Sequence, residues 1–167
     1  RNDYLDDQIG YFPLTISSHR QPALFGVLPG MGDPLNGTWQ SKQTYDHDLE
    51  ITKPFYYSTY LIDEDITVQF VPAAKSGVFT FEFPVDGNKR LKFNIVNQGK
   101  WEIRSEDSFE GIEEIEGMKV FVYGKFNQAS RLNIDSESPK PLLWADFTGS
   151  EGQVQFKYGI SFIDGEQ

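Results

Sequence analysis

The sequence predicts an all-β fold, an antiparallel β-sandwich of the supersandwich-like kind with little or no helix. Three observations predict it. Apolar and polar residues alternate with a period of two along several segments, turn-forming residues separate these segments, and no window shows a convincing apolar stripe with a period of 3.6. Such alternation places one face of each strand on a core and the other in water, which is typical of antiparallel sheets.

The clearest strands are expected at residues 66–70 and 79–83, where apolar and polar side chains alternate strictly. Pro72 and Gly77 interrupt the pattern between them, and both residue types favour a turn. These two strands are therefore expected to be neighbours separated by a short turn.

A second turn is expected at Asp86-Gly87-Asn88, because these residues tolerate positive φ, and we interpret it as a hairpin leading into a strand at 91–95. The segment 109–117 is the best helix candidate, but it is short and bounded by glycine, so it is equally compatible with a loop or a short strand. Further strands are expected at 118–123, 143–147 and 154–162.

Two segments look irregular: 19–44, which is rich in proline, glycine and asparagine, and 127–141, which is polar and ends in Ser-Pro-Lys-Pro. Long loops on a sandwich are where binding groups tend to lie. Both segments are therefore the first places to look for a functional site.

The size and charge of the chain limit its function. Its 167 residues, with 14 Phe, 8 Tyr and 3 Trp, suit a single domain, 1–167, with a substantial core. A formal charge of −10 would repel phosphate backbones and anionic lipids, so we expect neither a nucleic acid partner nor a membrane surface. No apolar run approaches the roughly 20 residues of a membrane span, and cysteine is absent.

The residues suggest no catalytic machinery. Two histidines, His19 and His47, cannot form a three-histidine zinc site, and no His-Glu-x-x-His or EF-hand spacing occurs. Carboxylates cluster at 63–65, which is best interpreted as a hairpin turn, and at 106–116, which is either a weak calcium site or an acidic rim. We therefore assign no catalytic residue and no metal ligand.

Four residues are candidates for holding a sugar: His19, Trp39, Asp46 and His47. A sugar is commonly held with its apolar face on an aromatic ring and its hydroxyls on carboxylate or imidazole groups. The alternative is structural: Trp39 would plug the base of its loop, and Asp46 would cap a turn. His19 would then be a buried histidine bonded to the backbone.

The run DHDLEITKPFYYSTYL at residues 46–61 resembles a known family signature. It is similar to the His-x-x-Glu-x-(Ala/Thr)-x-Pro-(Gly)-Tyr-Tyr-Ser-Val-x-Leu pattern in the N-terminal domain of family 92 glycoside hydrolases, which are calcium-dependent exo-acting α-mannosidases. Near the end, QFKYGISF at residues 155–162 with Glu166-Gln167 resembles the family's Val-Lys-Val-Gly-Ile-Ser-Phe-Val-Ser-x-Glu-Gln. Phe55 departs from the pattern, because glycine is usual there.

The resemblance implies that the chain is the N-terminal part of a longer α-mannosidase. In the family the general acid, the general base and the calcium ligands lie mainly in a C-terminal (α/α) barrel. The chain would then pack against that helical domain, form one wall of a pocket for mannose-containing glycans, and bind no cofactor itself. By itself it would be inactive. The resemblance further implies exo-acting α-1,2 hydrolysis and an extracytoplasmic location in a bacterium, periplasmic or secreted.

A function of another class is equally compatible with the aromatic-rich composition: a free-standing carbohydrate-binding or adhesion module. A purely structural module is a third alternative. An enzyme fragment should expose a broad apolar patch where the catalytic domain docks, whereas a binding module should show a compact cleft with one or two exposed rings.

Overall fold

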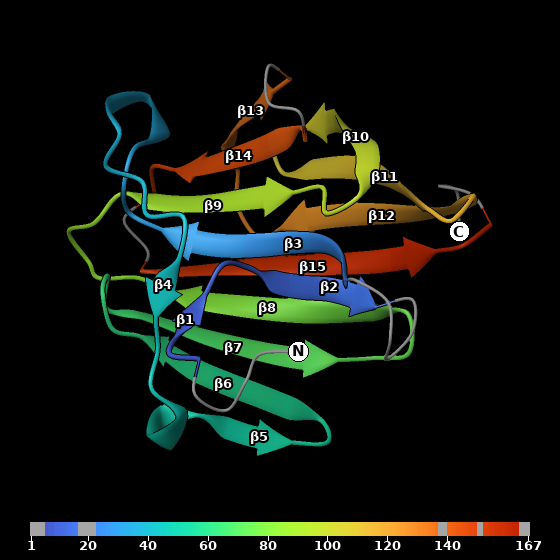
Figure 1. Cartoon of the computed structure of the whole chain (residues 1–167). Helices are drawn as coiled ribbons and strands as arrows, with labels where there is room; N and C mark the ends of the chain where they lie inside the picture. Colours follow the sequence, from blue (N-terminus) through green and yellow to red (C-terminus); the bar gives the residue numbers. More distant parts are fainter. Residues whose placement is uncertain (1–5, 17–22, 137–139, 150–151, 164–167) are drawn as a thin grey trace.

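The computed structural model describes residues 6–16, 23–136, 140–149 and 152–163 (Figure 1). Two antiparallel sheets pack face to face, and a small two-stranded ribbon lies beside them, so the predicted all-β sandwich is confirmed. The only helices among the described residues are two short 3-10 turns, η1 (Pro34–Asn36) and η2 (His47–Leu49). No helix in these ranges is long and apolar enough to cross a membrane.

The larger sheet has eight strands, and its neighbours pair in an antiparallel manner throughout. In spatial order they are β10 (Gln98–Ser105), β11 (Ser108–Ile115), β12 (Met118–Phe126), β15 (Gln153–Ser161), β8 (Ser76–Glu82), β7 (Ile66–Pro72), β6 (Tyr56–Leu61) and β5 (Ile51–Lys53). The smaller sheet contains, in order, β13 (Arg131–Asp135), β14 (Leu142–Phe147), β9 (Lys89–Asn94), β3 (Ala23–Gly30) and β2 (Phe12–Ile16). The ribbon pairs β1 (Gln8–Ile9) with β4 (Gln43–Thr44).

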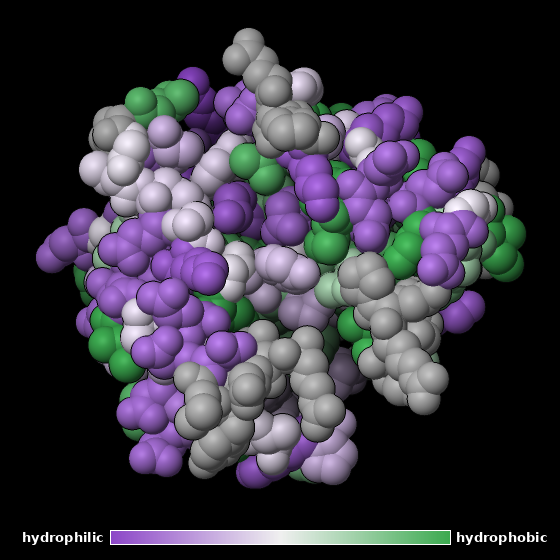
Figure 2. All heavy atoms as spheres, in the orientation of Figure 1, coloured by the Kyte–Doolittle hydropathy of each residue, from purple (hydrophilic) through white to green (hydrophobic). Residues whose placement is uncertain are grey.

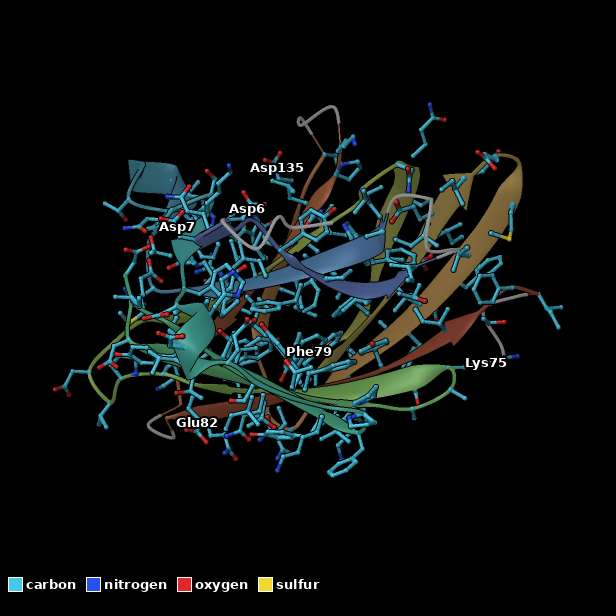
Figure 3. All side chains as sticks on the ribbon, turned by 60° about the horizontal axis from the view of Figure 1, so that its bottom comes forward. Asp6, Asp7, Lys75, Phe79, Glu82 and Asp135 are labelled. Atoms are coloured by element: carbon cyan, nitrogen blue, oxygen red, sulfur yellow. The ribbon has the colours of Figure 1, made fainter. Side chains whose placement is uncertain are left out.

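Aromatic side chains fill the space between the sheets, where Figure 3 shows Phe79. Phe93 of the smaller sheet meets Phe109 and Phe156 of the larger one, with ring centroids 4.7 and 4.8 Å apart. Phe109 and Phe156 in turn stack on each other at 5.7 Å. The alternation in the sequence therefore works as predicted, because the inward positions of both sheets supply one continuous core.

The expected strands are confirmed. The ambiguous segment at 109–117 is a strand up to Ile115, within β11, and ends in the turn Glu116-Gly117, where both residues have positive φ. The acidic run 63–65 is the turn between β6 and β7, as expected. Pro72 and Gly77, in contrast, pair with each other at the ends of β7 and β8, so the turn itself is Ala73 to Lys75.

The hairpin predicted at Asp86-Gly87-Asn88 is wrong. The strands on either side, β8 and β9, belong to different sheets, since β8 pairs with β7 and β15 while β9 pairs with β3 and β14. The segment is instead a crossover from one layer to the other. Alternation places apolar side chains toward the core in either case, so it does not distinguish a hairpin from a crossover.

The segments 19–44 and 127–141 are less irregular than expected. The first contains β3, an interior strand of the smaller sheet between β9 and β2, and the second contains β13 at the edge of that sheet. Alternation of apolar and polar residues does not reveal strand β3, because seven of its eight residues are buried. A strand covered on both faces has an almost continuous apolar run, and Gly26 and Pro29 within it resemble turn residues.

One buried carboxyl group lies beside a gap in the pairing of β3. The β2–β3 pairing keeps its register but omits Phe25, which has a φ of 49° and is fully buried. The N–H of Phe25 donates to Glu113 Oε2 across the sandwich, at 2.7 Å. Glu113 is fully buried, and its Oε1 accepts from both the backbone N–H and the side-chain amide of Asn97, at 2.5 Å each. The carboxyl group thus joins the two sheets through backbone donors.

Candidate functional site

Trp39 lies on the outer face of the smaller sheet. Its ring meets Trp144 edge to face, with centroids 4.9 Å apart, and Lys92 Nζ lies 5.6 Å from its centroid. The ring reaches the sheet because Gly30 has no side chain; a Cβ there would come within 2.6 Å of it. Trp39 is half-buried, and its indole N–H finds no hydrogen-bond partner among the described residues. The ring therefore packs its loop onto the sheet, as the structural alternative expected.

This face of the smaller sheet is partly desolvated by the loop that carries Trp39. Lys92 shows the effect, because burial lowers its pKa. Beside it the structure has a cleft of about 660 Å³ between η1 and strands β13 and β14. Figure 1 shows η1, the blue coil at the upper left, and β13 rising beside β14. The residues around this cleft include Asp33, Leu35, Arg90, Asn133, Trp144 and Asp146.

Asp46 caps η2. Its carboxylate accepts from the backbone N–H of Asp48 at 2.9 Å, in an extended conformation typical of an N-cap. The side chain therefore has a structural task, which is the alternative considered for it above.

His47 is tied into a hydrogen-bond chain beside η2. Its Nδ1 lies 2.6 Å from Glu50 Oε2, and its Nε2 lies 3.1 Å from the backbone carbonyl of Asp6. The other oxygen of Glu50 accepts from the hydroxyl of Tyr57. The ring of Tyr45 packs edge-on against the imidazole with centroids 4.9 Å apart. The chain of contacts joins Asp6, two residues before β1, to strand β6.

These partners favour the protonated form of His47. A carboxylate and a carbonyl oxygen both accept hydrogen bonds from a ring N–H, while the Tyr45 hydroxyl, 3.4 Å from Nε2, can either donate or accept. The hydrogen bond to Glu50 correspondingly raises the pKa of His47. Burial, together with the Glu50 carboxylate, raises the pKa of Tyr57. The polar atoms of this site already have partners within the chain.

We expect this contact to make stability depend on pH. Because the pKa of His47 is raised in the folded state, its contribution is fully present below the unfolded value of about 6.5 and is lost as pH rises through the folded value. The free energy of unfolding, measured by urea titration from pH 5 to 9, should fall over that window. The variant His47→Gln retains His19 and should lack this part of the dependence; an unchanged profile in the variant would contradict the assignment.

The structure separates the predicted sugar residues. Asp46 and His47 share η2, next to the edge of the larger sheet, whereas Trp39 packs on the smaller sheet. His19 lies outside the described residues. Sequence reasoning missed Glu50 and Tyr57 as the partners of His47, although the signature that contains His47 also contains both. It also missed Arg90, for which the sequence has no signal, since its partners come from other strands.

Calcium does not fit the described part of the chain. Within it, no three side chains of His, Asp or Glu come together as a metal site would need. Two of the carboxylates at the cleft, those of Asp33 and Asp146, already flank Arg90.

Comparisons with known proteins now identify the fold. Residues 3–161 match the family model described as the glycosyl hydrolase family 92 N-terminal domain. Similar solved structures include the family GH92 inverting mannosidase BT2199 of Bacteroides thetaiotaomicron, with a TM-score of 0.81 at 13% identity, covering 98% of this chain and 25% of that one. The GH92 α-mannosidase BT3965 of the same organism has a TM-score of 0.80 at 19% identity, covering 98% and 28%.

At these identities the structural likeness shows a shared fold, and the chain spans only about a quarter of either enzyme. No curated protein matches the chain. The family model, in contrast, matches nearly all of it, including the signature run at 46–61 and the strand that ends at Ser161. The chain therefore belongs to the family of glycosyl hydrolase family 92 N-terminal domains.

Proposed function

We propose that this chain is the N-terminal domain of an exo-acting α-mannosidase that cleaves α-1,2 linkages. In this proposal the sandwich packs against a helical catalytic domain and forms part of the wall of the mannose pocket. The observation that carries it is the family match over residues 3–161, together with a fold shared with two mannosidases over 98% of the chain.

The surface of the larger sheet supports a docking role. Strand β5 is an edge strand, and all three of its residues are exposed. Leu49, Ile51 and Phe55 around it are exposed by 51, 48 and 67%. An uncovered edge strand with apolar side chains is a surface that another domain normally protects. We propose that the helical domain covers it in the complete protein.

The remaining chemistry belongs to the catalytic domain in this proposal. Calcium would be bound there, since the described residues offer no site for it. The sandwich would contribute binding and shape, and by itself would hydrolyse nothing. The family's enzymes are the reason for placing the protein outside the cytoplasm of a bacterium, in the periplasm or secreted.

A free-standing carbohydrate-binding module is the second candidate function, and one observation favours it. The cleft of about 660 Å³ has the volume of a small-molecule site, and Trp144 belongs to its lining although this ring is only 8% exposed. It differs from the broad apolar patch expected of a docking face.

Hydrolysis separates the two functions. An α-1,2-mannobioside is incubated with the protein encoded by the complete gene and with this domain alone, each with calcium and with chelator. We expect calcium-dependent mannose release by the complete protein and none by the domain. If the complete protein releases no mannose while the domain binds mannosides, the binding-module function is correct instead.

A further inference from the structure

The cleft lies beside two adjacent rows of side chains on the outer face of the smaller sheet, and Arg131 and Lys92 of these rows do not line it. Strand register places Arg131, Asp146 and Arg90 opposite one another in one row. The next row on the same face contains Asn133, Trp144 and Lys92. A charged row thus lies directly beside a row with an aromatic residue at its centre.

Arg90 is the fixed centre of the charged row. Its side chain is only 14% exposed, and its Nε donates to Asp146. Its Nη1 donates to the carbonyl of Gly32 at 2.7 Å and lies 3.3 Å from Asp33 Oδ1. None of its hydrogen bonds within the described ranges uses Nη2. The guanidinium is therefore held rigidly, with spare donors between two carboxylates that are each about one-third exposed.

Apart from Asp135, the rest of the lining is apolar or neutral. Leu35, at the rim on η1, is 93% exposed, and Pro34 lies next to it. Trp144 lies on the sheet, with Asn133 of β13 beside it. These apolar side chains line the same cleft as the charged groups around Arg90. Figure 2, in the same orientation as Figure 1, shows a largely hydrophilic face with scattered hydrophobic side chains.

These features select a class of ligand. Three carboxylates, those of Asp33, Asp135 and Asp146, line the cleft against one arginine, so an anion such as a phosphate or a uronate would be repelled. A wholly apolar ligand would bury the polar groups without partners, which is unfavourable. Neighbouring donors and acceptors beside an apolar surface match a pyranose, which carries vicinal hydroxyls and an apolar C–H face.

We propose that this cleft binds a short, neutral saccharide. Spare Arg90 Nη2 donors hydrogen-bond one hydroxyl, the carboxylates of Asp33 and Asp146 accept from its neighbours, and Leu35 packs against the C–H face of the ring. The volume of about 660 Å³ lies within the range of small-molecule sites. Mannose as the sugar rests on the proposed function, whereas the site itself rests on the cleft. The bound glycan would touch neither His47 nor Asp46, which lie at η2.

The test is a titration of this chain with α-1,2-mannobiose, followed by NMR of backbone amides and by calorimetry. We expect saturable binding, with shifts confined to η1 and its flanking residues and to β9, β13 and β14. Leu35→Ala should weaken binding about tenfold, the order expected for removing an apolar contact from a pocket. Because Leu35 is 93% exposed, this variant should fold normally. Glucuronic acid should not compete.

Leu49→Ala is the matched control, since Leu49 is an exposed leucine of the other 3-10 turn, η2. It should bind like the parent chain. Loss of binding in Leu49→Ala but not in Leu35→Ala would place the sugar at η2 and overturn the proposal, as would no saturable binding at all. If the complete protein hydrolyses mannosides while this chain binds none, only this inference fails. If this chain binds at the cleft while the complete protein hydrolyses nothing, only the proposed function fails.

Discussion

Phe93→Ala should lower the free energy of unfolding by about 3–5 kcal/mol, the usual cost of deleting a large buried ring. Phe93 is fully buried, and its ring contacts Trp101, Phe109, Phe126 and Phe156 of the opposite sheet. Removing it leaves a cavity that neither sheet can close by itself, because its neighbours are held by separate strands. Denaturation in urea, followed by the near-ultraviolet signal of the aromatic rings, measures the loss.

Phe55→Ala is the control for this change. The ring of Phe55 is 67% exposed at the turn between β5 and β6. The same substitution there should change the free energy of unfolding by less than about 0.5 kcal/mol. Equal losses in the two variants would show that the sheets do not pack through Phe93.

Glu113→Ala should lower the free energy of unfolding by about 3 kcal/mol or more. The change leaves three donors, the N–H groups of Phe25 and Asn97 and the side-chain amide of Asn97, without their acceptor in the interior. Glu113→Gln should cost less, since its amide oxygen can still accept. Thermal and urea denaturation of both variants measures the difference.

Glu114→Ala provides the comparison, because Glu114 is the next residue of β11 and is exposed. It should be close to neutral. If Glu113→Ala were as mild as Glu114→Ala, the hydrogen bonds of the Glu113 carboxyl group to Phe25 and Asn97 would not stabilise the junction of the two sheets.

The sequence predicts those strands that have one face on the core and the other face exposed to solvent. The alternation of apolar and polar residues predicts strands β7 and β8, and the burial of their side chains follows this alternation closely. The sequence pattern does not predict strand β3, because a strand buried on both faces lacks the alternation of apolar and polar residues. The order of strands was not predictable either. Residues 83–88 join two sheets, yet a crossover and a hairpin place the same residues inward.

The site was predictable only where its partners are close in sequence. His47 and Glu50 are three residues apart, and their spacing in the signature run anticipates their contact. Arg90 gains its partners Asp33 and Asp146 from η1 and β14, which only the folded sheet brings together. Glu113 is one of several acidic residues between 106 and 116. It is buried where it accepts a hydrogen bond from Phe25, which lies 88 positions away in the sequence. Long-range pairing of this kind leaves no local pattern.

The most direct test of the central claim, that this sandwich is the first domain of a mannosidase, is complementation. The protein encoded by the complete gene is expressed without residues 1–161, and this chain is then added to it in the presence of calcium. The account predicts that the truncated protein releases no mannose from an α-1,2-mannobioside alone and regains activity when this chain is added. Full activity without the chain, or none even in the uncut protein, would contradict it.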